Sequence, residues 1–144
     1  MGVTNLTTFT LDVDKALDGI KADVNQFKRL IAFDLLGRIV ERTPVDTGRA
    51  RANWQVSINA PVITEVRYPN KESIPEGKSE SVIAESVKLE GGIVIADVEL
   101  GEDIWITNNL PYIEVLEQGD HSKQNTEGIV AISVAEVAEG MTRI

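Results

Sequence analysis

The chain has 144 residues, of which 14 are Lys or Arg and 23 are Asp or Glu, so its formal net charge at pH 7 is -9. A surface with this acidic balance repels phosphate backbones and anionic lipids, which argues against nucleic acid or a membrane as the main ligand. The chain contains no cysteine, which excludes disulfides, thiolate metal sites and cysteine nucleophiles.

A chain of this length is expected to form one domain, residues 1–144, around a single core. No apolar run approaches the ~18 residues that a membrane-spanning helix needs. The first ten residues lack the basic and apolar regions of a signal peptide. We therefore expect a single domain without a membrane anchor.

Apolar residues three or four positions apart predict a long helix from about Val13 to Arg42, which Pro44 prevents from continuing. Residues 1–12 then form an N-terminal arm. Such a helix is roughly 45 Å long, whereas the radius of gyration of a domain of this size is about 15 Å. We expect that it either kinks near Gly37 or is covered by a neighbouring subunit.

The apolar period changes to two after Gly48, where alternation from Ala52 to Ile58 predicts a strand. Residues 62–68 are compatible with a second strand. Prolines and a polar run, however, predict a surface loop over residues 61–80.

A short helix is predicted from Ser81 to Leu89, because the two glycines at positions 91 and 92 are typical of a helix end. Alternating apolar residues from Val94 to Leu100 then predict a strand. This strand is expected to pair in antiparallel fashion with Ile104–Thr107.

A second short helix is predicted from Pro111 to Gly119, and a C-terminal helix from Thr126 to Met141. Trp54 and Trp105 fall in predicted strands, where tryptophan usually belongs to the core. The expected fold class is thus α+β: a long N-terminal helix packed on a small, mostly antiparallel β-sheet with one or two short helices.

His121 is the single histidine of the chain, next to Asp120 and four residues after Glu117. A metal site needs three or four convergent ligands, and this group lacks the two-histidine helical spacing of a metallohydrolase. We therefore expect no catalytic residue, no metal and no cofactor. The alternative is a small metal-dependent or His-dependent hydrolase that uses His121.

Arg38, Arg42, Arg49 and Arg51 form a local basic cluster in an acidic chain. They can compensate the helix dipole while their stems pack beside the core, or they can form ion pairs with carboxylates of an adjacent subunit. We favour the pairing between subunits.

Two ordered sequence blocks flank the predicted sheet region. The first reads Arg42-Thr43-Pro44-Val45-Asp46-Thr47-Gly48-Arg49-Ala50-Arg51-Ala52-Asn53-Trp54. In this block Pro44 ends the predicted helix, the side chains of Asp46 and Thr47 can hydrogen-bond within the turn, and Gly48 permits a positive φ, so the motif is a structural corner. The second block comprises Ile106-Thr107-Asn108-Asn109-Leu110-Pro111-Tyr112-Ile113-Glu114, Gln118-Gly119 and Ser122-Lys123-Gln124. Together the two blocks resemble the tail-completion and neck (head-tail joining) proteins of long-tailed bacteriophages.

The resemblance implies a structural virion protein and not an enzyme. It implies a ring of six or twelve copies in the neck or tail, assembled in the host cytoplasm, between the portal-side connector and the tail tube or terminator proteins. DNA would pass through the lumen without specific binding, and an acidic wall would suit that passage. The candidate residues for subunit interfaces are Arg49, Arg51, Tyr112, Glu117, Lys123 and Gln124.

Overall fold

The structure is a computed structural model that describes residues 6–44, 49–65, 79–118 and 128–142. The fold is mixed helix and sheet, as expected from the sequence. Its elements are α1 (Leu6–Arg42), α2 (Arg49–Ala52), β1 (Trp54–Ile58), α3 (Ser79–Ala96), β2 (Ile104–Asn108), α4 (Ile113–Glu117) and α5 (Val130–Thr142).

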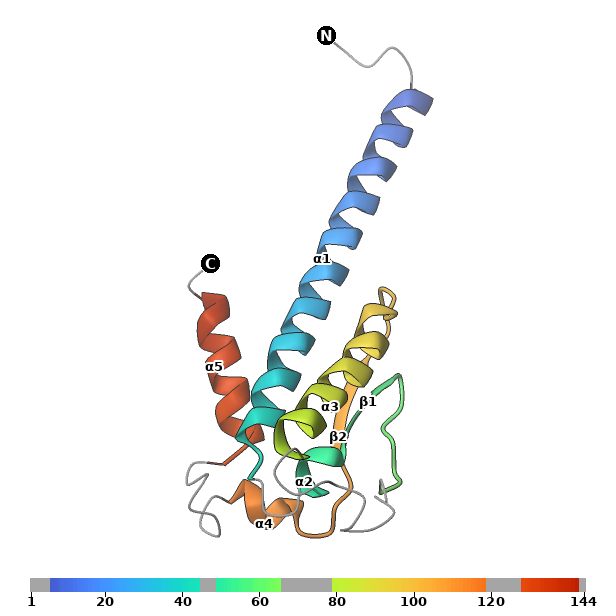
Figure 1. Ribbon diagram of the computed structural model, residues 1–144. Helices are drawn as coiled ribbons and strands as arrows, with labels where there is room; N and C mark the ends of the chain where they lie inside the picture. Colours follow the sequence, from blue (N-terminus) through green and yellow to red (C-terminus); the bar gives the residue numbers. More distant parts are fainter. Residues whose placement is uncertain (1–5, 45–48, 66–78, 119–127, 143–144) are drawn as a thin grey trace.

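The long helix α1 lies between α5 and α3, while β1 packs on α3 and pairs with β2 (Figure 1). Leu36, Ile39 and Val40 of α1 are fully buried because their spacing places them on the face toward α3 and the sheet. Trp54 of β1 and Ile95 of α3 complete the centre of the core. The core thus surrounds only the C-terminal half of α1.

The helix α1 begins at Leu6, so the prediction of a start near Val13 and an N-terminal arm over residues 1–12 was wrong for residues 6–12. Once a helix is nucleated, each further residue adds a hydrogen bond, and no proline interrupts the chain before Pro44. The helix is also continuous through Gly37 and does not end there.

The strands β1 and β2 form a two-stranded antiparallel sheet whose register runs from Trp54↔Asn108 to Ile58↔Ile104. The predicted hairpin between residues 94–100 and 104–107 was therefore wrong, because β2 pairs with β1. The strand predicted from Ala52 begins two residues later, since residues 49–52 form the short helix α2.

The helix α3 continues to Ala96, although the glycine pair was predicted to end it. A Cβ on Gly91 would lie 2.6 Å from Cδ2 of Leu36 and 2.8 Å from Cγ2 of Val56. A Cβ on Gly92 would lie 2.8 Å from the Phe33 ring. The two glycines therefore let α3 approach α1 and the sheet closely, and they do not end the helix.

The tryptophans differ in their burial. Trp54 is in the core, as predicted, but Trp105 is 41% exposed, so its prediction as a core residue was wrong. Alternate strand residues face opposite sides, and Trp105 is paired with Ser57 on the face away from α3, while Val56 contacts Gly91 of that helix.

Two predicted helices are confirmed in outline. The short helix after Pro111 is α4, and the C-terminal helix is α5. Residues 61–65 contain no helix or strand, whereas α3 begins at Ser79, so the loop predicted over residues 61–80 ends too late. The rest of the predicted loop, residues 66–78, lies outside the described residues.

Candidate assembly surface

The corner between α1 and β1 is held by a chain of hydrogen bonds through Thr43. The Thr43 hydroxyl donates to the carbonyl of Ile39 at 2.7 Å and accepts the Trp54 indole N–H at 2.8 Å. Both Thr43 and Trp54 are buried. The first motif block therefore joins the end of the helix to the start of the sheet, as a structural corner should. The turn residues 45–48 themselves lie outside the described part of the chain.

Arg51 reinforces this corner from α2. Its Nε donates to the carbonyl of Thr43 at 2.9 Å, and its Nη2 donates to the carbonyl of Glu41 at 3.0 Å. The last carbonyls of a helix lack partners within the helix, and Arg51 supplies donors to them. Within the chain, Arg51 thus stabilises the end of α1.

The second motif block packs against the first. Asn108 donates from Nδ2 to the carbonyl of Ala50 at 2.9 Å, and its Oδ1 accepts the backbone N–H of Leu110 at 3.1 Å. Asn109 donates to the carbonyl of Val62 at 2.7 Å. Leu110 and Ala50 are buried. Residues that are far apart in the sequence but belong to the two blocks thus form one hydrogen-bonded unit.

Arg49 is exposed and forms an ion pair with Glu65 of the same chain. The hydrogen bond that Arg49 donates to the Glu65 carboxylate is the main cause that raises the pKa of the Arg49 guanidinium, and Tyr112 contributes to the same shift. Tyr112 is itself exposed at the start of α4. Arg49 and Tyr112 are therefore accessible to a neighbouring subunit, and their role at an interface stays a prediction.

Glu117 binds the first turn of α5. Its carboxylate accepts the backbone N–H groups of Ile129, Val130 and Ala131 at 2.8–3.0 Å. These groups lack partners within the helix, and the helix dipole favours a negative charge at this end. No local pattern in the sequence predicts this cap, because Glu117 precedes α5 by more than ten residues. The predicted contact of Glu117 with a neighbouring ring is not tested.

Two further interface candidates, Lys123 and Gln124, lie outside the described residues, and so does His121. The hydrolase based on His121 therefore stays an alternative prediction. Among the described residues, no group of three or more His, Asp or Glu side chains is placed to hold a metal ion. None of the helices in this part of the chain is long and apolar enough to cross a membrane.

Arg38 and Arg42 connect α1 to α5 through Glu136. Arg38 donates to Glu136 at 2.5 Å and to Asp34 of its own helix at 2.8 Å, and Arg42 also pairs with Glu136. The hydrogen bond from Arg38 is the main cause that lowers the pKa of Glu136 below its ordinary value. No local signal in the sequence marks Glu136, because its partners precede it by more than ninety residues.

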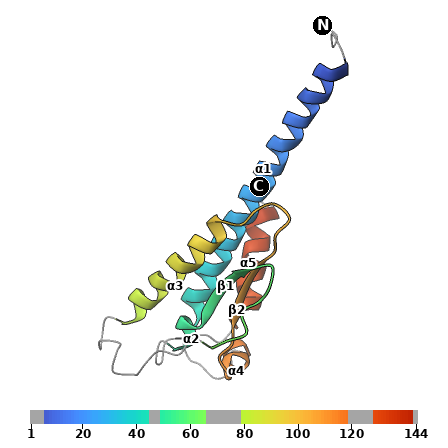
Figure 2. The same cartoon turned by 90° about the vertical axis from the view of Figure 1, so that its right-hand side faces the viewer.

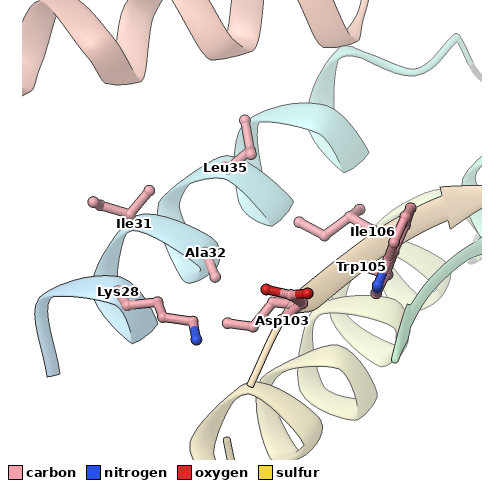
Figure 3. A pocket seen from close by; sticks show the side chains of 8 residues that line it. Lys28, Ile31, Ala32, Leu35, Asp103, Trp105 and Ile106 are labelled. Atoms are coloured by element: carbon pink, nitrogen blue, oxygen red, sulfur yellow. The ribbon is translucent and has the colours of Figure 1, made fainter. Parts of the chain in front are cut away.

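An apolar groove of about 430 Å³ runs between α1 and β2 (Figure 3). Lys28 and Asp103 are its charged members, and Lys28 donates to the backbone carbonyl of Glu102. Such a lining suits packing against another apolar surface. The other lining residues are Ile31, Ala32, Leu35, Ile104, Trp105 and Ile106.

The N-terminal half of α1 projects beyond the rest of the molecule (Figures 1 and 2). Every side chain from Asp14 to Val24 is exposed. Four apolar residues at spacings of three, four and three nevertheless share one face of this half and are 44–59% exposed. We call this set the α1 stripe: Leu17, Ile20, Val24 and Phe27.

A second set of uncovered apolar residues lies along the C-terminal end of α3 and the turn that follows it. Leu89 and Ile93 of α3 and Leu100 of the turn are 47–67% exposed, and Ala96, the last residue of α3, is also exposed. We call these four residues the α3 stripe. Scattered exposed apolar residues are normal on a protein surface, but sets aligned along a helix indicate an interaction surface.

Comparison with known proteins gives no match to a family model, a curated protein or a solved structure.

Proposed function

We propose that this chain is a structural protein of a bacteriophage particle, a neck or tail-completion subunit that forms a ring at the head-tail junction. The observation that carries the proposal is the α1 stripe on a helix that extends beyond its own core. A helix whose apolar side chains remain in water gains little from hydrophobic burial, so a partner surface is needed to stabilise it.

The corner motif supports the same proposal. The two blocks that resemble head-tail joining proteins form one connected unit through the bond from Asn108 to Ala50. This unit fixes the C-terminal end of α1 relative to the core, and so the direction in which α1 projects from it. A subunit whose task is mechanical needs a rigid connection between its core and its contact surfaces, and a buried, hydrogen-bonded corner supplies one.

The partners in this proposal are further copies of the chain, in a ring of six or twelve, together with the adjacent connector and the tail tube or terminator proteins. The net charge of -9 suits a ring whose lumen lets DNA pass without specific binding. The protein would then reside in the virion, after assembly in the host cytoplasm.

Particle assembly with Val24→Glu tests the proposal, because this change places a charge in the α1 stripe. The matched control is Gln26→Glu, which adds the same charge on another face of the same exposed helical segment. We expect Val24→Glu to be lost from purified particles, or to prevent their completion, while the control is incorporated normally. Normal incorporation of Val24→Glu, or absence of the unmodified chain from particles, would contradict the proposal.

A further inference from the structure

We infer that the α1 stripe of one copy docks, in antiparallel orientation, on the α3 stripe of the next copy. This inference rests on the proposed function, since it names the contact by which the ring would close. The α1 stripe is thus covered by a second copy of this chain, and the surface that covers it is the α3 stripe of that copy.

Ring symmetry requires two different surfaces. A two-fold dimer uses one patch twice, whereas a ring of more than two copies uses a head-to-tail contact between two distinct patches. The described part of the chain offers such a pair, because both stripes are uncovered and lie on different elements: one on α1, the other on the end of α3 and the turn after it. Each copy can therefore contact one neighbour through its α1 stripe and the other neighbour through its α3 stripe.

The residue spacings of the two stripes match. Along α1 the steps are three, four and three residues, and along the α3 stripe they are four, three and four. In an antiparallel alignment that sets residue 21 beside residue 97, Ile93 falls between Val24 and Phe27, and Ala96 falls between Ile20 and Val24. This alternation lets Ile93 and Ala96 of α3 each fill the gap between two apolar side chains of the facing α1.

Charges at the edge of the contact favour the same alignment. Lys21 and Lys28 follow directly after Ile20 and Phe27 on one flank of the α1 stripe, seven residues apart. Glu90 and Asp97 follow Leu89 and Ala96 in the same way, also seven residues apart. The antiparallel alignment places Lys21 beside Asp97 and Lys28 beside Glu90 at once.

Lys28 can take part in this contact although it already donates to the carbonyl of Glu102 in its own chain. An ammonium group has three donors, so a carboxylate at the rim can share it. Exposed pairs of this kind add little affinity, but they select orientation and partner. The apolar stripes would supply the attraction, and the charges would set the register.

Cysteine cross-linking tests the docking, since the chain has no native cysteine. Chains with Val24→Cys are mixed with chains that carry Ile93→Cys, then oxidised both as purified protein at high concentration and in assembled particles. A disulfide needs Cα atoms about 4.4–6.8 Å apart, so we expect at least about tenfold more adduct than with Ala22→Cys, which lies on the opposite face of α1. A chain with both cysteines should give a ladder of linked copies.

An adduct between the Val24→Cys and Ile93→Cys chains in either preparation supports the docking. Its absence from both preparations, or adducts formed only between two Val24→Cys chains, would overturn the docking, the latter in favour of a two-fold pair. These results are separate from the proposed function. If particles contain the chain but yield no adduct, the proposed role in the virion stands without the docking. If the purified chain forms the adduct but is missing from particles, the role in the virion is refuted.

Discussion

Trp54 donates its indole N–H to the hydroxyl of Thr43 at 2.8 Å, at the point where the long helix gives way to the sheet. The same hydroxyl donates to the carbonyl of Ile39, so it connects the last turn of α1 with the first residue of β1. Both side chains are buried, and water cannot replace either bond without opening the core. The Thr43 hydroxyl therefore helps to set the direction of α1 relative to the sheet, together with the bonds that Arg51 donates to the end of α1.

Replacing Thr43 by Val keeps the shape of the side chain but leaves the Trp54 N–H without its partner. An unsatisfied buried donor costs about 1–3 kcal/mol, so the free energy of unfolding should fall by about that amount. Urea denaturation of the purified chain measures it. The double variant Thr43→Val with Trp54→Phe should lose less than the sum of the two single changes, because the donor is removed as well. Strict additivity would show that the two side chains are not coupled.

Glu117→Ala should loosen the first turn of α5. The carboxylate accepts three backbone N–H groups there, and loss of a helix cap costs about 0.5–2 kcal/mol. We expect faster hydrogen exchange at Ile129, Val130 and Ala131, with little change in α3. Glu114→Ala, which removes an exposed carboxylate of α4, serves as the control. Unchanged exchange at the start of α5 would mean that the cap contributes nothing in solution.

The ion pairs of Glu136 predict a specific dependence of stability on pH. Hydrogen bonds from Arg38, then Arg42, lower the pKa of this carboxyl below its ordinary value of 4.5 in the folded chain. The folded state then binds fewer protons than the unfolded state below that pH, so the stabilisation is fully present above it and lost as the pH falls.

The measurement compares urea unfolding of the natural chain and of Glu136→Gln from pH 7 down to pH 3. The difference in free energy of unfolding should stay constant at the upper end of this range and shrink as the pH falls below 4.5. Other carboxylates titrate in the same range, and the comparison of two variants removes their contribution. A difference that is independent of pH throughout would contradict the assignment.

Arg49 and Arg51 should respond differently to charge reversal. Arg51 holds two carbonyls at the end of α1, so Arg51→Glu is expected to lower the stability of the isolated chain. Arg49 is exposed beside Glu65, so Arg49→Glu should leave thermal unfolding nearly unchanged. If Arg49 contacts a neighbouring subunit, Arg49→Glu will lower the yield of complete particles, and only this variant separates assembly from folding.

The elements that could be predicted from the sequence are those whose signal is local. The three- and four-residue spacing of apolar side chains predicted the main part of α1, and alternation around Trp54 predicted β1. The corner was also predictable, because proline and the residues after it restrict the backbone directly. A comparison of helix length with domain size predicted that α1 kinks near Gly37 or is covered by a neighbouring subunit, but it did not predict which residues form the exposed stripe.

The features that escaped prediction depend on contacts between distant residues. The partner of β2 is β1, nearly fifty residues earlier, and alternation alone does not identify which strand a second one joins. Glu117 and Glu136 carry no local mark of their roles. Trp105 was assigned to the core by residue type, but register with Ser57 puts it on the outer face. In each case the position or role of the residue depends on a contact with a distant part of the chain, which residue type alone does not indicate.

Gly91 shows how such pairing changes the meaning of a residue, and it provides the last prediction. In an exposed helix, replacing Gly by Ala stabilises by roughly 0.5–1 kcal/mol. At position 91 the new methyl group would lie 2.6 Å from Leu36 and 2.8 Å from Val56. Overpacking of a core costs about 1–3 kcal/mol, which outweighs the helical preference.

Gly91→Ala should therefore lower the free energy of unfolding by up to about 2 kcal/mol, once the gain in helical preference is subtracted from the cost of overpacking. Gly37→Ala is the matched control, because it too lies within a long helix but its Cβ would meet nothing within 4 Å. It should raise stability instead. Opposite signs for the two variants, measured by urea denaturation, follow if Gly91 is a contact between α3, α1 and the sheet. Equal stabilisation by both would show that α3 does not pack closely at Gly91.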